Sequence, residues 1–513
     1  MSLRALLSVY DKQGLEAFAR GLSELGFELV ASGGTAEHLT GHGLEVTPVD
    51  ELTDVPALLE GRVKTLHPSI HAAILARRDR PGDLATLEEH GIEPFDLVCV
   101  NFYPFAGVVA RHGVREEDAV EMIDIGGPAM LRAAAKNFGH VIAVCRPERY
   151  DAVLEELRDG GGGLAEEARR ELAAEAFAVT ACYEASIAAW FGDRQSFPQM
   201  LIPSFEKTLD LAYGENPHQR AAYYAEVGAR RHLLSMVEQL HGRQLSLVNL
   251  YDLSAGRLLL REFTVPACAL VKHANPCGVA VAATIEEAYD RALACDPVSA
   301  FGVVCVVNRP VTAALAERLA ERFVDVLFAP GYEEGALDTL RAKEGTRILV
   351  DNERRRFSAG EKDYRRVLGG LLVQDRDWDV EERESMQVVC GSPSETLWGD
   401  LLFAWRACKH VSSNAIVLAR DLATIGIGGG QTSRVDAVRL AVDKARLHGH
   451  ELDGSVLASD AFFPFPDGPQ AALEAGVAAV IQPGGSKRDP DVIAAVERAG
   501  AVMVFTGRRH FRH

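Results

Sequence analysis

The first 145 residues alternate short apolar runs with stretches of helical periodicity, and this alternation limits the folds open to the chain. Apolar runs at 3–9 and 27–30 flank residues 15–25, where apolar side chains recur at helical spacing. Further apolar runs at 97–100 and 141–144 continue the pattern. Because a strand–helix–strand order returns the second strand alongside the first, the N-terminal part is predicted to be an α/β domain built on a parallel sheet.

The length of the chain predicts more than one domain. At 513 residues it exceeds what one hydrophobic core usually holds. Pro198 and Pro203 interrupt the stretch 192–204. We therefore expect a boundary there, between a domain at 1–198 and a second region at 199–513.

Two partly similar strings in the second region suggest an internal duplication. Lys272-His273 is followed by a phenylalanine-containing turn at 296–301, and Lys409-His410 is followed by a related turn at 459–463. A duplicated subdomain would explain both strings. Chance similarity explains them equally well.

Composition excludes several functional classes. The formal charge of −19 argues against nucleic acid as a partner, because such binding needs many lysines and arginines on one face. No apolar run approaches the ~18 residues of a membrane-spanning helix, and the N-terminus reads as a first strand rather than a secretory signal. The nine cysteines form no CxxC pair and lie mostly in apolar runs, which indicates reduced thiols and a cytoplasmic protein.

The run 271–278 places a cation and a proton carrier side by side. Residues 267–271 predict a buried strand, so Lys272 and His273 are expected at its C-terminal edge, where open α/β sheets bind ligands. An imidazole can accept a proton at cellular pH, and the Lys272 charge favours its neutral form, which suits deprotonation of an amine. A histidine that only hydrogen-bonds a turn explains the same residues.

A catalytic zinc is another interpretation of this run, because zinc deaminases also contain a histidine followed by a Pro-Cys pair. Their pattern needs a glutamate two residues after the histidine and a second cysteine three residues after the first. Asn275 and Ala280 occupy those positions. We therefore expect no catalytic metal.

Several loops combine glycine with hydroxyl or cationic side chains, as phosphate sites do. The segment 32–35 follows the second apolar run, and the segment 428–434 joins a predicted strand to a predicted helix. Other polar residues of the N-terminal part fall in loops at strand ends, namely Arg62, Lys64, Thr65, Asn101, Tyr103, Asp124 and Lys136. Two lysines and a tyrosine suit stabilisation of an oxyanion, although each residue alone fits a solvated loop.

Long motifs in order across nearly the whole chain carry a resemblance to a known family. They are SVYDKQGL, ASGGTAEHL, GRVKTLHP, NFYPF, IDIGGPAMLRAAAKN, YGENPHQ, VKHANPCG, KHVSSNAIV, GGGQTSR, SDAFFPF, IQPGGS and TGRRHFRH. The chain resembles the bifunctional purine-biosynthesis enzymes that join AICAR transformylase to IMP cyclohydrolase. The resemblance implies a methylglyoxal-synthase-like domain followed by two cytidine-deaminase-like α/β subdomains without zinc, roughly at 205–380 and 381–513.

The resemblance also implies two consecutive reactions. The transformylase moves a formyl group from 10-formyltetrahydrofolate to the 5-amino group of AICAR, giving FAICAR and tetrahydrofolate. The cyclohydrolase then closes FAICAR to IMP with loss of water. A cytoplasmic homodimer is expected, with transformylase sites completed across the subunit interface.

The motifs of this family imply roles for individual residues. The catalytic residues expected for cyclisation are Lys64, Tyr103, Asp124 and Lys136. The nucleotide-binding residues expected beside them are Lys12, Ser32, Gly33, Gly34, Thr35, Arg62, Thr65, Asn101, Gly126 and Gly127. For formyl transfer, His273 is expected to take a proton from the amine, Lys272 to support it electrostatically and Asn414 to hold the formyl group. The substrate contacts expected there are Tyr213, Asn249, Ser299, Arg434, Arg509 and Phe511.

Three positions depart from the family pattern. Ala212 stands where the family usually has arginine, Phe138 where it often has histidine and Val303 where glycine is common. Loss of a charge-assisted phosphate contact at Ala212 is expected to weaken binding by about 1.5–3 kcal/mol. A nucleotide-sensing N-terminal domain is the non-enzymatic alternative, but a sensor needs only the Gly-Gly-Thr loop and a cation, so the four catalytic residues together favour catalysis.

Overall fold

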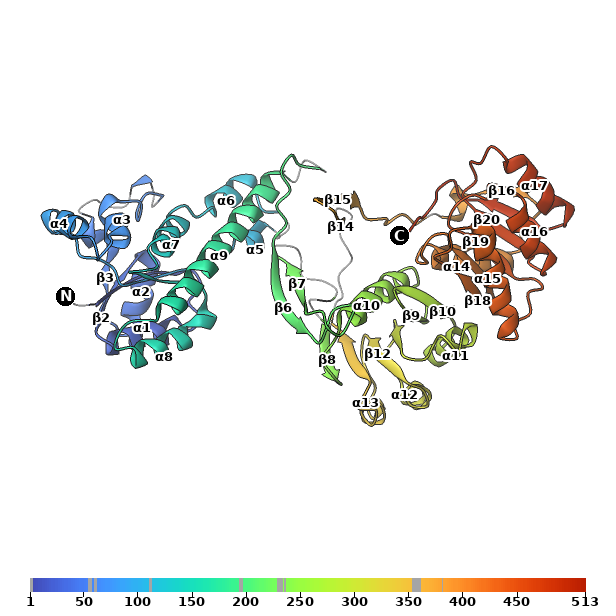
Figure 1. The fold of residues 1–513 in the computed structure, drawn as a ribbon, viewed down its shortest axis with the longest axis horizontal. Coiled ribbons are helices and arrows are strands. Elements are labelled where there is room, and N and C mark those ends of the chain that lie inside the picture. The colour runs from blue at the N-terminus through green and yellow to red at the C-terminus, as the bar shows by residue number, and fades with distance from the viewer. Residues whose placement is uncertain are drawn as a thin grey trace. The chain divides into compact units, whose positions relative to one another are not determined.

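Figure 1 shows a computed structural model of the chain, which describes residues 3–53, 58–59, 62–109, 113–192, 197–227, 234, 237–352, 361–380 and 382–513. The chain folds into two compact units. The first unit is Met1–Glu206 with Glu226–Arg230, and the second is Lys207–Ala225 with Arg231–His513. The division falls slightly beyond the boundary expected at 198, and the activity of each part stays a prediction.

The first unit contains a five-stranded parallel sheet with the order β3-β2-β1-β4-β5. Its strands are β1 (Leu3–Ser8), β2 (Phe27–Ala31), β3 (Thr47–Pro48), β4 (Leu97–Val100) and β5 (Ile142–Val144). Its helices are α1 (Leu15–Glu24), α2 (Gly33–Gly41), η1 (Val49–Leu52), α3 (Pro68–Leu75), α4 (Pro81–Glu89), α5 (Phe105–Val109), α6 (Glu116–Glu121), α7 (Gly126–Lys136), η3 (Pro147–Arg149), α8 (Tyr150–Asp159) and α9 (Glu166–Gly192). The predicted parallel α/β domain is confirmed.

Helices bury both faces of this sheet. Leu7 of β1 belongs to a core with side chains of α1 and α8, whereas its neighbour Leu6 belongs to a core with side chains of α3, α7 and α9. Successive residues of a strand point to opposite faces, so a sheet covered on both sides needs continuous apolar runs. Polar side chains are therefore left to the loops at the carboxyl ends of the strands.

The long helix α9 is an exception to the expectation that no stretch of the chain is long and apolar enough to span a membrane. An 18-residue window of α9 has a mean hydropathy of 1.2 and meets the length and composition of a membrane span. A core helix meets the same criteria, and Leu172, Ala173 and Ala176 of α9 pack into the cores of the first unit. The apolar character of α9 thus has an explanation within the fold.

The second unit contains a twelve-stranded sheet with the order β16-β21-β20-β19-β17-β18-β10-β9-β11-β12-β13-β8. Its strands are β8 (Val237–His241), β9 (Ala267–Lys272), β10 (Asn275–Val281), β11 (Val303–Val307), β12 (Val324–Ala329), β13 (Arg347–Asp351), β16 (Gln387–Cys390), β17 (Ile416–Arg420), β18 (Ala423–Gly428), β19 (Val456–Ser459), β20 (Ala479–Gln482) and β21 (Val502–Phe505). Two small sheets pair β6 (Phe205–Leu211) with β7 (Ala221–Glu226) and β14 (Lys362–Val367) with β15 (Gly370–Asp375).

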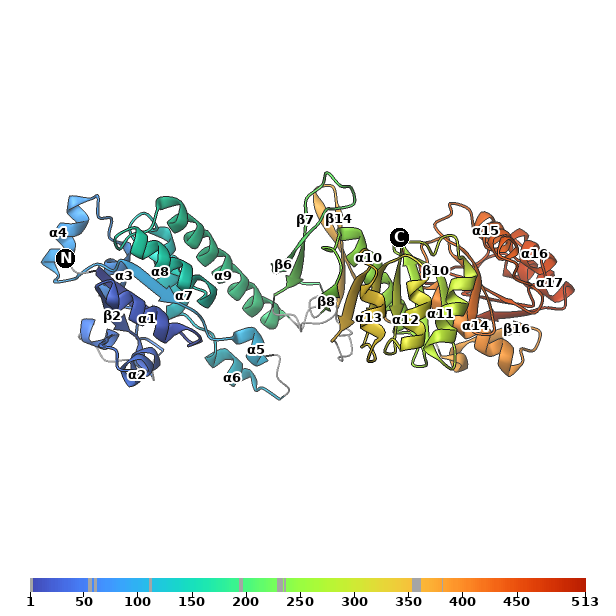
Figure 2. The same ribbon diagram turned by 90° about the horizontal axis from the view of Figure 1, so that it is seen from below.

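Helices cover both faces of the large sheet. They are α10 (Leu247–Leu260), α11 (Ile285–Cys295), α12 (Ala313–Ala320), α13 (Ala336–Arg341), η5 (Arg383–Ser385), α14 (Glu395–Cys408), α15 (Arg434–Leu447), α16 (Asp467–Glu474) and α17 (Asp489–Arg498). Side chains of α10 and α14 share one core, and side chains of the remaining α-helices supply two other cores. Figure 2 shows the ribbons of these helices beside the strands of the sheet.

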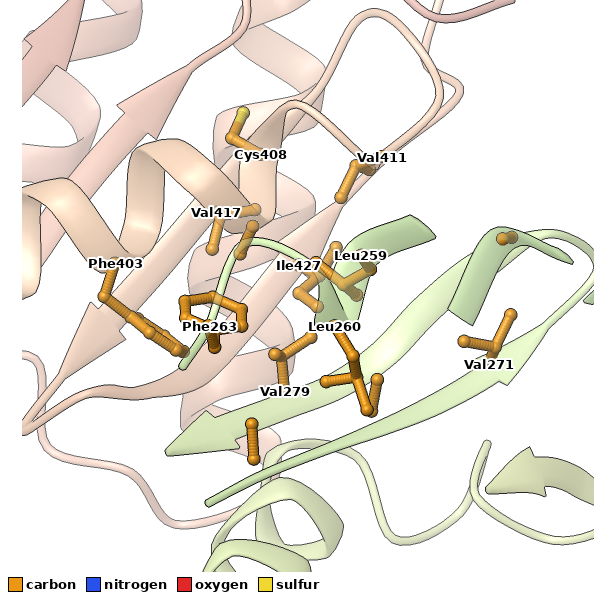
Figure 3. Packing of buried hydrophobic residues seen from close by; sticks show 14 of the residues in the cluster. Leu259, Leu260, Phe263, Val271, Val279, Phe403, Cys408, Val411, Val417 and Ile427 are labelled. Atoms are coloured by element: carbon orange, nitrogen blue, oxygen red, sulfur yellow. The ribbon is translucent and has the colours of Figure 1, made fainter. Parts of the chain in front are cut away.

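The large sheet is built from two copies of one motif. The order β8-α10-β9-β10-α11-β11-α12-β12-α13-β13 recurs as β16-α14-β17-β18-α15-β19-α16-β20-α17-β21. The copies meet where β10 pairs with β18. Figure 3 shows the shared core, to which Val271 and Val279 of the first copy and Val417 and Ile427 of the second belong. The predicted duplication is confirmed.

The strings that suggested the duplication are, however, not equivalent in the two copies. Lys272-His273 ends β9 and begins the turn to β10, so its counterpart is Arg420-Asp421 between β17 and β18. Lys409-His410 instead follows α14 and precedes β17. Residues 296–301 precede β11, whereas 459–463 begin at the end of β19. Short strings recur by chance, while the order of elements follows from burial, so topology is the better guide.

Candidate active sites

The loop after β2 and the N-terminus of α2 form the centre of a candidate site in the first unit. Ser32 is the N-cap residue of α2, and its Oγ lies 2.8 Å from the Oγ of Ser8 at the end of β1. The Lys12 ammonium donates to Thr35 Oγ1 at 3.0 Å. Burial lowers the pKa of Lys12, and the nearby Asp11 opposes the shift. A cation beside a helix N-terminus is an arrangement that binds phosphate.

Two further predicted residues approach glycines closely. A Cβ atom placed on Gly33 would lie 2.6 Å from Lys64 Nζ, and one placed on Gly126 would lie 2.5 Å from Thr65 Oγ1. The Lys64 ammonium, which is also 3.8 Å from Asp50 Oδ2, therefore lies at the first residue of α2. The Thr65 hydroxyl lies at the first residue of α7. Side chains larger than hydrogen at these two positions would displace the lysine and the threonine.

Asp124 lies just before α7 and is partly buried. Its Oδ1 accepts the Gly127 N–H at 2.8 Å, and its own N–H donates to the hydroxyl of Tyr183 in α9 at 2.7 Å. Burial raises the pKa of Asp124, and the Gly127 N–H opposes the shift. A carboxyl group with a raised pKa at the rim of a polar cluster is a candidate for proton transfer.

Asn101 and Tyr103 follow β4 and lie beside the loop after β1. Asn101 Oδ1 accepts the N–H groups of Tyr10 and Asp11 at 2.6 and 2.9 Å. The exposed ring of Tyr103 packs edge-on against the ring of Tyr10, with 5.1 Å between centroids. The carboxyl ends of β1, β2 and β4 thus bring polar residues to one edge of the sheet, as parallel strands require.

Arg62 and Lys136 are placed differently. Arg62 is exposed and forms an ion pair with Glu121 of α6. Lys136 is the exposed last residue of α7, whereas Gly126 is its first. At 1.5 Å per residue the two ends of α7 lie about 15 Å apart, so the structure does not bring Lys136 to Asp124. The sequence prediction placed Lys136 in a loop at a strand end, where the structure has the far end of a helix.

In the second unit, a cavity of about 470 Å³ brings together four of the residues predicted for formyl transfer, namely Asn414, Arg434, Arg509 and Phe511. Arg434 begins α15, and its Nη2 donates to Asn414 Oδ1 at 2.7 Å. Asn414 Nδ2 donates to the Gln431 carbonyl at 2.9 Å. These two bonds hold the Asn414 amide in one orientation. The cavity is large enough for a small ligand and combines aromatic with cationic walls.

Lys272 ends β9 and His273 begins the turn to β10, and neither is among the residues that line this cavity. The Lys272 ammonium donates to the Phe301 carbonyl at 2.9 Å. His273 is exposed, and its ring makes no hydrogen bond within the part of the chain that the structure describes. Asn275 Oδ1 accepts the Ser412 N–H at 2.7 Å, which ties the turn to the segment that carries Asn414.

Asp252 of α10 is a buried residue that the sequence analysis did not single out. Its carboxylate accepts the N–H of His273 at 3.2 Å and the N–H of Ala274 at 2.5 Å. One aspartate in an amphipathic helical pattern carries no signal of its own. Its contact with the turn exists only after α10 has packed on β9.

Tyr213, Asn249 and Ser299 have structural partners outside the cavity lining. Asn249 is buried, forms a capping box at the start of α10 and donates to Asp325 Oδ2 at 2.7 Å. The Ser299 hydroxyl donates to Asp296 Oδ2 at 2.7 Å. The structure therefore gathers four of the predicted transformylase residues in the cavity, and the others are not among the residues that line it.

Among the described residues, one group of side chains lies close enough to hold a metal ion, namely Glu16, His38 and His42 on the surface of the first unit. Both imidazoles lie 3.1 Å from Glu16 Oε1 and are paired with it. Near His273, burial raises the pKa of the Cys277 thiol to about 12. The expectation of no catalytic metal stays a prediction.

Comparisons with known proteins match both units. The family model described as "AICARFT/IMPCHase bienzyme" matches residues 134–444, and that described as "MGS-like domain" matches residues 14–129. Proteins named "Bifunctional purine biosynthesis protein PurH" from Bacillus cereus (strain AH820) and Bacillus anthracis (strain A0248) are each 46% identical over 516 residues, covering 100% of this chain and 100% of the relative. A solved structure titled "Crystal structure of ForH" is 43% identical, with 37% of this chain and 100% of that chain covered and a TM-score of 0.34.

Proposed function

We infer the function from the fact that the chain belongs to the AICARFT/IMPCHase bienzyme family. It is a bifunctional enzyme of purine biosynthesis that transfers a formyl group to AICAR and cyclises the product, FAICAR, to IMP. The observation that carries this conclusion is the 46% identity over the full length of the curated relatives. Their alignment covers the motifs of both reactions.

We propose that the second unit performs the transfer and that 10-formyltetrahydrofolate is the donor. The amine nitrogen of AICAR attacks the formyl carbon, and the bond between that carbon and N10 of the folate breaks. His273 accepts the proton that leaves the amine and returns a proton to N10, which gives tetrahydrofolate. Lys272 supports His273 electrostatically, and the Asn414 amide, oriented by Arg434, donates to the formyl oxygen.

The first unit is proposed to perform the ring closure. The carboxamide nitrogen of FAICAR attacks the formyl carbon, and the former formyl oxygen leaves as water after it has gained two protons, one from the carboxamide nitrogen and one from the formylated nitrogen. Lys12 and the hydroxyls of Ser32 and Thr35 bind the phosphate at the N-terminus of α2. Lys64 and Tyr103 stabilise the oxygen, and Asp124 moves the proton of the carboxamide. Lys136 is left out of this step because α7 holds it about 15 Å from Gly126.

A cytoplasmic homodimer is the proposed working form. The cavity that contains Asn414 and Arg434 is not lined by Lys272 or His273, so a second copy is expected to complete the transformylase site. Mixing a His273→Ala variant with an Asn414→Ala variant tests this idea. If two chains share a site, unfolding and refolding the mixture restores part of the transfer activity that each variant lacks. Mixed dimers without any transfer activity would contradict a shared site.

The central test is a coupled assay on the purified protein with AICAR and 10-formyltetrahydrofolate, in which IMP formation is followed. His273→Ala is expected to abolish transfer and to leave cyclisation of added FAICAR unchanged. Lys64→Met is expected to have the opposite effect. A Lys64→Met protein that cyclises FAICAR normally would instead support a nucleotide-sensing role for the first unit.

A further inference from the structure

We propose that Asp252 is a positioning residue for His273: its buried carboxylate holds the β9–β10 turn in the conformation that aims the imidazole at the substrate amine. The inference rests on the proposed role of His273 in formyl transfer. It adds a residue of α10 that no motif of the sequence singled out.

The backbone of this turn needs an external support. His273 has a φ of 54° and Ala274 a φ of 57°, so both residues occupy the left-handed region that glycine, not histidine or alanine, normally fills. Two successive residues of this kind form a tight hairpin turn that favours Asn-Gly. The turn therefore keeps a conformation that its own residues do not favour.

Asp252 supplies that support with both carboxylate oxygens. Oδ2 accepts the His273 N–H at 3.2 Å, and Oδ1 accepts the Ala274 N–H at 2.5 Å. Asp252 is buried, so water does not compete for these bonds. From the other side, Arg512 Nη1 donates to the Ala274 carbonyl at 2.7 Å. The peptide groups of the turn are thus bound on both sides, while His273 is exposed.

The second copy of the motif contains the same device without a histidine. Asp400 of α14 is buried and accepts the N–H groups of Asp421 and Leu422 at 3.0 and 2.7 Å in the β17–β18 turn. These two residues have φ values of 52° and 62°. The guanidinium of Arg291 donates to the Asp421 carbonyl. The hairpin support therefore belongs to the duplicated fold, and in the first copy it carries the proton acceptor.

The duplication explains how the positioning arises. Because a buried carboxylate binds the two N–H groups of the turn, the side chain of the first turn residue is not needed to hold the turn in place. In one copy that position is the charged Asp421, and in the other it is His273, next to Lys272 at the end of β9. A tight backbone restricts where the ring can point, which is what a proton acceptor in an amine attack requires.

The test compares Asp252→Asn with the matched control Asp400→Asn in the full-length protein. Asparagine keeps one oxygen acceptor and turns an NH2 group toward the other N–H, so each variant loses one support of one turn. Asp252→Asn is expected to lower kcat for formyl transfer by about 100-fold, the scale of a misplacement of roughly 1 Å. The KM for AICAR and the cyclisation of FAICAR should change less than twofold. Asp400→Asn should leave all three quantities unchanged.

A second measurement reports on the imidazole without catalysis. Diethylpyrocarbonate modifies exposed histidines, and mass spectrometry gives the rate at His273. The rate is expected to change in Asp252→Asn and to equal that of the parent in Asp400→Asn. If Asp252→Asn does not fold, Asp252→Glu keeps the charge and shifts the turn by one methylene, with the same expected effects.

Two outcomes are decisive and differ from each other. A parent protein without formyl transfer overturns the proposed function and, with it, this inference. A parent that transfers formyl, together with Asp252 and Asp400 variants that have the same kcat and the same His273 modification rate, overturns the inference alone. An equal loss of kcat in both variants also overturns it, because it would show a general loss of stability.

Discussion

Removal of the Asp460 carboxylate is expected to destabilise the second unit strongly, because it leaves a buried guanidinium without its counter-charge. The Asp460 side chain is 0% exposed, and that of its partner Arg434 is 8% exposed. Asp460 Oδ1 accepts from Arg434 Nη1, and Oδ2 accepts the Ser413 hydroxyl at 2.5 Å. In Asp460→Ala, Arg434 Nη1 keeps only Ser459 Oγ, at 2.8 Å, as an acceptor.

The magnitude follows from burial. Truncation of one partner of a buried ion pair costs about 3–5 kcal/mol, because the remaining charge stays desolvated. Helix α15, which begins with Arg434, also contains an exposed control pair, Asp436 with Arg439. The side chains of this pair are 55% and 64% exposed and lie 3.2 Å apart. An exposed pair contributes less than about 1 kcal/mol, so Asp436→Ala should change stability little.

Denaturant unfolding followed by tryptophan fluorescence measures the difference. Trp398 and Trp405 lie in α14, whose side chains share a core with β17, so they report on the second unit. A double variant that combines Asp460→Ala with Arg434→Met is expected to lose less than the sum of the two single variants, since it removes the unpaired charge. Equal destabilisation by Asp460→Ala and Asp436→Ala would refute the reasoning from burial.

Three other outcomes are expected. Gly278→Ala should abolish folding of the second unit or lower its stability severely, because a Cβ there would lie 1.9 Å from the Ala292 carbonyl oxygen; circular dichroism and the yield of soluble protein report the effect. Burial raises the pKa of Asp124, so ionisation of this carboxyl lowers the stability of the folded state as pH rises from the unfolded-state pKa through the folded-state pKa. Asp124→Asn has no carboxyl to ionise there, so the stability of the variant relative to the parent should increase between acidic and neutral pH, as unfolding curves over that range would show. Burial raises the pKa of Cys99 to about 12, so iodoacetamide at pH 8 should label Cys99 only after unfolding, as peptide mass spectrometry would show.

Local patterns in the sequence were sufficient for the elements that carry the site. The apolar runs at 3–9, 27–30 and 97–100 correspond to β1, β2 and β4, and the glycine-rich segment 428–434 joins β18 to α15. Each of these features depends on residues that are close in the chain. Periodicity and loop chemistry act over that range, so the sequence reports them directly.

Features that depend on distant residues were missed or misplaced. Lys136 was expected to lie near Asp124 and instead ends α7, about 15 Å from the first residue of that helix, because a helix separates its two ends by 1.5 Å per residue. The second Lys-His string, Lys409-His410, lies at the end of α14. The counterpart of His273 in the second copy is instead Asp421, a residue of another type. The two copies are therefore recognised by the order of their strands and helices and not by similarity of their amino-acid sequences.

The sequence alone predicts the order of strands and helices, the motifs of the two reactions and the family. Each of these depends on residues that lie near one another in the chain. Which side chains meet is a different matter. The pairing of Asp252 with the His273 turn, of Arg434 with Asn414 and Asp460, and of Lys64 with the first residue of α2 each joins separate elements. Such contacts form only when helices pack against sheets and exclude water, so they depend on the folded structure as a whole.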